Sequence, residues 1–72
     1  MKLTVELMRQ NDGRWLAEVR ELGGMAVFGA DRIDAFRRAE AMALRTLATR
    51  LETGKPIHGA PAELTLSFNL VA

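Results

Sequence analysis

Hydrophobic and polar residues alternate in the first part of the chain with the period of β-strands. Between Lys2 and Arg9, Leu and Val residues occupy alternate positions, as expected for a strand with one buried face. Asp12-Gly13 follows, which is a strong signal for a tight hairpin turn. The alternation resumes from Arg14 to Arg20, with Trp15 at one end of its apolar side. The pattern predicts a β-hairpin whose buried face ends at Trp15.

A third strand and a long helix are predicted next. Met25 to Phe28 is short, apolar and rich in residues that favour strands, and the period changes to a helical one from Arg32 to Thr53. Asp31 is a favourable N-cap, and Asp34 lies where a capping box places its second acid. Gly54 suits the position just after a helix. We expect the apolar side of this helix to face the sheet. It comprises Ile33, Phe36, Ala39, Ala43, Leu44, Leu47 and Leu51.

The chain returns to strand-like alternation from Glu63 to Leu70, after a loop over residues 56–61 that begins and ends with proline. The predicted order is therefore β-β-β-α-β. A right-handed crossover places the last strand parallel to the first. We expect one α+β domain over residues 1–72, with a four-stranded, mainly antiparallel sheet and one long helix on one face.

The small size of the domain favours self-association. A chain of 72 residues buries only about 60% of its unfolded surface, and three Phe and one Trp give it little aromatic bulk. A second copy that covers apolar surface would supply the missing burial. We therefore expect a homodimer or a higher oligomer, formed through the sheet face away from the helix and an edge strand.

Charge and cysteine content narrow the classes of function. There is no cysteine, no apolar run long enough for a membrane span and no signal-peptide pattern at the N-terminus. The net charge is +1, and acids and bases are interleaved rather than gathered in a basic stripe. We expect a cytoplasmic protein that binds neither membranes nor, through this chain alone, nucleic acid.

Few residues are candidates for chemistry. Glu6, Glu40 and Glu63 could imitate a three-carboxylate nuclease site, which needs clustered oxygens around two cations. However, Glu6 is expected on the outward face and Glu63 at a strand edge. Glu40 falls within the apolar side of the helix, so it is buried, paired with Arg37 or at an interface. His58 is the only histidine, and no second His or Cys accompanies it. We assign no catalytic residue, cofactor or metal site, and expect no enzyme activity.

Four segments, taken in order, resemble the HicB-like family of small antitoxin domains. They read GRWLAEV in the second strand, FGADRIDA at the start of the helix, LATRLETGKPI at its end and LSFNLVA in the last strand. The resemblance covers nearly the whole chain and implies a partial ribonuclease-H-like sheet with a helix on one face. It is closest to short, stand-alone members that have no DNA-binding domain.

The resemblance implies an antitoxin of a type II toxin–antitoxin system, which binds a small basic HicA-type ribonuclease toxin directly and blocks it. Glu18 and Glu21 are the best local acids for meeting such a toxin. As exposed charges they are expected to contribute little to stability. The alternative is an orphan oligomeric binding module of the same fold, with a different protein or small-molecule partner.

Overall fold

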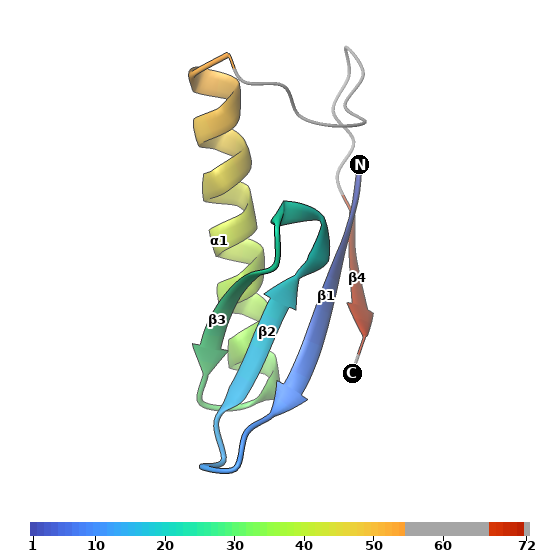
Figure 1. Cartoon of the computed structure of the whole chain (residues 1–72), viewed down its shortest axis with the longest axis vertical. Coiled ribbons are helices and arrows are strands. Elements are labelled where there is room, and N and C mark those ends of the chain that lie inside the picture. The colour runs from blue at the N-terminus through green and yellow to red at the C-terminus, as the bar shows by residue number, and fades with distance from the viewer. Residues whose placement is uncertain (55–66, 72) are drawn as a thin grey trace.

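The computed structural model describes residues 1–54 and 67–71 and contains a four-stranded sheet with one helix. The strands are β1 (Lys2–Arg9), β2 (Trp15–Val19), β3 (Met25–Gly29) and β4 (Ser67–Val71), and the helix is α1 (Arg32–Glu52). A single-turn 3-10 helix, η1 (Arg20–Leu22), links β2 to β3. The strand order is β3-β2-β1-β4, and α1 covers one face (Figure 1). The predicted α+β class and element order are confirmed.

The two predicted antiparallel pairings and the parallel one are all present. β1 pairs antiparallel with β2, with Val5 opposite Val19, and β2 pairs antiparallel with β3. β4 runs parallel to β1, with Leu3 opposite Phe68. The predicted last strand began at Glu63, but Pro56, His58 and Glu63 lie outside the described residues. Arg20 was expected in β2 and instead begins η1.

The hairpin turn between β1 and β2 is closed by Asp12. Its carboxylate accepts hydrogen bonds from the backbone N–H of Arg14 at 3.0 Å and from Arg14 Nε at 2.7 Å. These bonds, the backbone one first, lower the pKa of Asp12. Gly13 has a φ of 88°, a left-handed conformation that glycine adopts without a steric penalty. The Asp-Gly signal therefore predicts the turn correctly.

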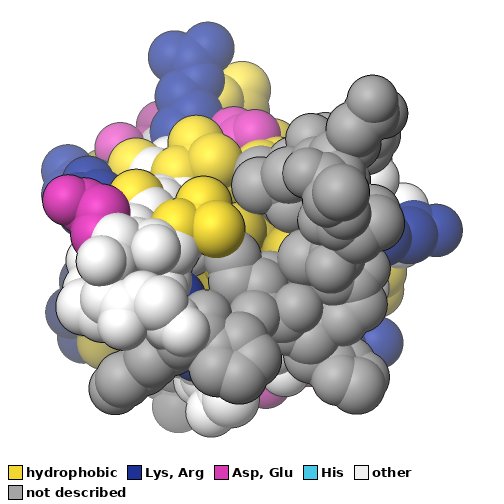
Figure 2. Space-filling model, turned by 90° about the horizontal axis from the view of Figure 1, so that it is seen from above, with side chains coloured by type: hydrophobic (Ala, Val, Ile, Leu, Met, Phe, Trp, Pro, Cys, Tyr) yellow, Lys and Arg dark blue, Asp and Glu magenta, His cyan; other side chains and the backbone are white. Residues whose placement is uncertain are grey.

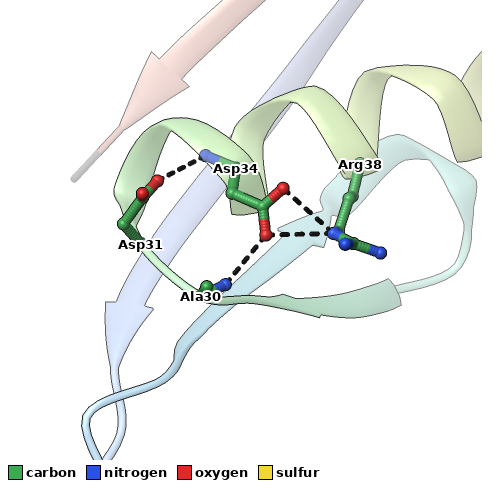
Figure 3. A network of polar contacts seen from close by, with 4 residues as sticks. All are labelled: Ala30, Asp31, Asp34 and Arg38. Carbon is green, nitrogen blue, oxygen red and sulfur yellow. Dashed lines mark hydrogen bonds and ion pairs between the residues drawn. The ribbon is translucent and has the colours of Figure 1, made fainter.

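The start of α1 is held by two aspartates (Figure 3). Asp31 is the N-cap, and its Oδ1 accepts the backbone N–H of Asp34 at 2.7 Å. The Asp34 carboxylate accepts the backbone N–H of Ala30 at 2.8 Å and pairs with Arg38 Nε at 3.0 Å. These two contacts lower the pKa of Asp34. The predicted cap is confirmed, although Asp34 reaches the amide before the N-cap residue rather than that of Asp31.

The helix packs on the sheet through small side chains. Ala35, Ala39, Ala43 and Leu47 recur every fourth residue and are all buried. α1 lies mainly against β3 and β2 and less against β1. The sheet side of the core is formed by Leu3, Val5, Leu7, Ala17, Val19 and Leu22. Alanines bring the helix backbone close to the strands, so the core consists of aliphatic residues and alanine, as the composition suggested.

The predicted apolar side of α1 is partly wrong. Ala39, Ala43 and Leu47 are buried and Phe36 is half-buried, but Ile33, Leu44 and Leu51 are exposed. Ala35, which was not included, is fully buried. Compared with the prediction, the buried stripe is thus rotated about the helix axis, so that the alanines and not the large apolar residues face the sheet. The cause is the close approach of helix and sheet, which selects small residues over large ones at the contact.

That close approach is tightest at Gly29, the last residue of β3. A Cβ at this position would lie 2.8 Å from the Ala35 Cβ and closer still to the Ala35 backbone. Gly29 needs no unusual φ and is buried at the end of the strand. Its role is to leave room for the first turn of α1.

No helix among residues 1–54 and 67–71 combines the length and apolar character that crossing a bilayer requires.

Candidate protein-binding surface

The sheet face that points away from α1, called the outer face below, carries Glu18, one of the two predicted partner-binding acids. Alternation along each strand determines its members, since residues next to the core positions point the other way. It comprises Lys2, Thr4, Glu6 and Met8 of β1, Leu16 and Glu18 of β2, Ala26 and Phe28 of β3, and Ser67, Asn69 and Val71 of β4.

Two carboxylates meet at the middle of the outer face. Glu6 of β1 and Glu18 of β2 are directly opposite each other in the antiparallel register, and both are half-buried. Arg20 forms an ion pair with Glu6, and this contact raises the pKa of Arg20. Glu18 makes no hydrogen bond or ion pair with the part of the chain that the structure describes. Like charges on facing positions repel each other. A cation that approaches the outer face would therefore stabilise the Glu18 carboxylate.

Glu21, the second predicted acid, is already engaged within the fold. It lies in η1, and its two carboxylate oxygens accept the backbone N–H of Thr4 at 2.6 Å and the Thr4 hydroxyl at 2.7 Å. Desolvation by itself would raise the pKa of Glu21, but the Thr4 hydrogen bonds outweigh it and the pKa is lowered. The Glu21 carboxylate thus bonds to β1 at Thr4, one residue beyond Val5, which forms the last β1–β2 pair with Val19. Because both carboxylate oxygens bond within the fold, we expect Glu21 to contribute more to stability than an unpaired exposed acid would.

An apolar row borders the acidic pair on the outer face. Met8, Leu16 and Phe28 are aligned across β1, β2 and β3 by the strand register. Phe28 is exposed, and the guanidinium of Arg14 lies 4.1 Å from its ring centroid, a cation–π contact. No local pattern in the sequence indicates this row, because it arises only when three strands are in register. Trp15 packs against the core from the other face, as expected.

The carboxylates considered for metal chemistry are not brought together. Glu6 points outward from β1, whereas Glu40 lies on α1 on the opposite side of the sheet. Within residues 1–54 and 67–71 there is no group of three or more potential metal ligands. Glu40 is half-buried, and neither it nor Arg37 makes a hydrogen bond or ion pair with the described residues. Glu63 and His58 lie outside those residues.

A shallow pocket of about 310 Å³ lies beside the last turns of α1, lined by Thr46, Thr49, Arg50 and Thr53. The three hydroxyls donate to helix carbonyls, with Thr46 bonded to Met42 O at 3.0 Å and Thr49 to Arg45 O at 3.0 Å. The lining therefore offers one charged group and no acid–base pair. Its geometry gives no basis for assigning chemistry to it.

Comparison with family models, curated proteins and solved structures gives no match to this chain. The functional interpretation therefore rests on the order of the elements and on the outer face. Of the two carboxylates on the outer face, Glu18 is the one without a hydrogen bond or ion pair to residues 1–54 and 67–71.

Proposed function

We propose that this chain is a HicB-like antitoxin domain that binds a small basic ribonuclease toxin of the HicA type and has no chemistry of its own. Two features support the proposal. The β-β-β-α-β order is the one that the resemblance implies, with its helix on a single face of the sheet. The outer face also offers a surface for a basic protein, because half-buried carboxylates lie beside exposed apolar side chains.

The facing pair Glu6 and Glu18 is the observation that carries the proposal. Arg20 is ion-paired with Glu6 and interacts with Glu18 only through its charge, so the two half-buried acids together keep an excess negative charge. A Lys or Arg of the toxin placed over Glu18 would form a charge-assisted hydrogen bond there. The neighbouring Met8–Leu16–Phe28 row would add apolar burial around that contact. Protein interfaces commonly combine an apolar centre with polar and charged groups around it, and the outer face offers both kinds of group side by side.

The test is direct binding to the product of a neighbouring short, basic reading frame. The two chains are co-expressed and co-purified, and the ribonuclease activity of the toxin is titrated with the antitoxin. We expect a stoichiometric complex without residual activity. A basic neighbour that neither binds nor is inhibited would contradict the antitoxin proposal.

Glu18→Gln then tests the surface. It removes one charge without changing shape, and the toxin affinity should fall several-fold with the melting temperature unchanged, because Glu18 has no bond in the described structure. Glu52→Gln is the matched control, since it removes the same charge at the far end of α1. Equal affinities of the two variants would exclude the outer face as the binding surface.

The second candidate, an oligomeric binding module with another partner, is favoured by a different observation. Ile33, Leu44 and Leu51 expose a large apolar area on α1, away from the outer face. Co-purification from the native host separates the two candidates, because a bound partner other than a small basic ribonuclease supports the second.

A further inference from the structure

One side of α1 carries an unpaired row of large apolar residues, called the helix flank below. Ile33 is 66% exposed, Leu44 48% and Leu51 58%. They are separated by eleven and seven residues, close to three and two turns at 3.6 residues per turn, so they line up along the helix. At 100° per residue they lie about 120–140° around the helix from Ala39, whereas Thr46, whose hydroxyl contacts Met25 of β3 at 3.5 Å, lies within the stripe of buried alanines. The helix flank therefore faces away from β3.

The exposed apolar surface is large for so small a protein. In addition to the helix flank, Leu70 of β4 is 44% exposed, and its register with Val5 places it on the side of the sheet that carries α1. The largest contiguous apolar patch on a monomeric protein is roughly 300–600 Å² and often functional, and larger patches mark interaction sites. Hydrophobic side chains also reach the surface at the end of the molecule where α1 finishes, next to charged ones (Figure 2). The helix flank has the character of a surface that is covered in solution.

Two charged residues on the helix flank identify what covers it. Arg37 and Glu40 lie between Ile33 and Leu44 in the row, and neither is paired within the described part of the chain. The spacings from 33 to 37, 37 to 40 and 40 to 44 are four, three and four residues, which is the spacing of a coiled-coil seam. Read from either end, this series has the same spacing, with an apolar residue outside and a charged residue inside.

A seam with this symmetry is complementary to itself when two helices run antiparallel. In that arrangement residues whose numbers add up to a constant face each other. For a sum of 77, Arg37 faces Glu40 of the second copy and Glu40 faces Arg37 of the second copy. With the same sum, Ile33 faces Leu44 of the second copy, and Leu44 faces Ile33 of the second copy. One two-fold axis thus satisfies both charges and covers both apolar residues.

We infer that the helix flank from Ile33 to Leu44 is a homodimer interface, in which α1 pairs antiparallel with α1 of a second copy about an axis between residues 38 and 39. Leu51 lies beyond the end of the second copy's α1 in this arrangement. The inference does not depend on the proposed toxin. It replaces the expectation that the sheet carries the self-association surface. The outer face of each protomer points away from such an interface, so both outer faces stay free for partners.

Charge-reversal variants test this interface and its register. Sedimentation equilibrium of the wild type at micromolar concentration should give twice the protomer mass of 8.0 kDa. Arg37→Glu places Glu against Glu twice, and Glu40→Arg places Arg against Arg twice, so each variant should weaken dimerisation about tenfold or more. The double variant in one chain restores both pairs and should dimerise as the wild type does.

The mixture of the two single variants is the decisive sample. One chain then carries Glu at both positions and the other Arg at both, so a heterodimer regains both ion pairs. Arg45→Glu is the control, since Arg45 is exposed, lies about 100° around the helix from Leu44 and therefore off the helix flank, and should leave the dimer unchanged. Far-UV circular dichroism confirms that all variants are folded. A monomeric wild type, single variants that dimerise normally, or a mixture that stays monomeric would each overturn the inference.

Discussion

Replacing Gly29 with alanine tests the close contact between α1 and the sheet. The added Cβ would meet the backbone of Ala35 and lie 2.8 Å from its Cβ, well inside van der Waals contact. Relief requires α1 to move away from β3, because the obstructing atoms belong to the helix backbone rather than to a flexible side chain. That movement would also loosen Ala39 and Ala43, which are fully buried in the same contact.

The expected loss lies at the upper end of the overpacking range, about 3 kcal/mol. A 72-residue domain has a total stability on the order of 4–11 kcal/mol at ~0.05–0.15 kcal/mol per residue. The variant therefore loses a large share of it. At about 4–8 °C per kcal/mol for a domain of this size, the melting temperature should fall by ~12–24 °C. Urea denaturation followed by circular dichroism measures the change, at one protomer concentration throughout because association shifts the midpoint.

Two further variants separate this cause from others. Ala35→Gly combined with Gly29→Ala removes the Cβ contact but leaves the backbone contact, so we expect no recovery of stability. Gly13→Ala meets no atom within 4 Å and suffers only from its left-handed φ of 88°, at a cost of about 1–2 kcal/mol. If Gly29→Ala unfolds within ~0.5 kcal/mol of the wild type, α1 does not approach β3 as closely as described.

Three other changes probe the core, the helix cap and the hydrogen bonds between Glu21 and Thr4. Leu47→Ala should cost about 2–5 kcal/mol in urea denaturation because Leu47 is buried, whereas Leu44→Ala should cost under ~1 kcal/mol in the monomer. Asp31→Ala removes the bond to the Asp34 amide and should lower the unfolding free energy by about 0.5–2 kcal/mol; an unchanged midpoint would show that the cap is not formed. Glu21→Gln should destabilise the protein at neutral pH, and the difference from wild type should close under acid conditions. The folded pKa of Glu21 is lowered, so its contribution is complete above the unfolded pKa and disappears as the pH falls through the folded one. A difference that persists at acid pH would exclude the Thr4 bonds as its source.

The sequence predicts the elements of this fold well because each carries local signals. The alternation in β1 and the Asp-Gly turn after it are confirmed, as is the N-cap at Asp31. The helix was expected to end at Thr53 and ends at Glu52, with Gly54 in the left-handed conformation expected after a helix. These features depend on residues within a few positions of one another.

The orientation of α1 about its axis could not be predicted in the same way. Hydrophobicity ranks Ile33, Leu44 and Leu51 above alanine, yet the contact with the sheet selects the alanines because Gly29 lets the helix approach closely. That selection depends on the distance between two elements, which no local pattern contains. The rotation of the buried stripe also explains why Glu40 is only half-buried. It was expected within the apolar side that faces the sheet and lies on the helix flank instead.

The role of Glu21 was missed for a similar reason. Its carboxylate bonds to Thr4, seventeen residues earlier in the chain, at a place determined by where β2 stops pairing with β1. Glu18 differs because it lies on a strand whose alternation already places it on the outer face. The sequence therefore places Glu18 on the outer face, but it does not distinguish an acid that bonds within the fold from one that makes no such bond.

The parallel pairing of β1 with β4 has a consequence for folding kinetics. Lys2 is opposite Ser67, so two segments more than sixty residues apart must meet before one edge of β1 is paired. The hairpins β1–β2 and β2–β3 connect near neighbours and can form early, whereas closing so long a loop is slow. During synthesis β1 therefore presents an open edge until residues 67–71 have been made. An unpaired strand edge can recruit other strands, so the nascent chain should be most prone to aggregation in that interval.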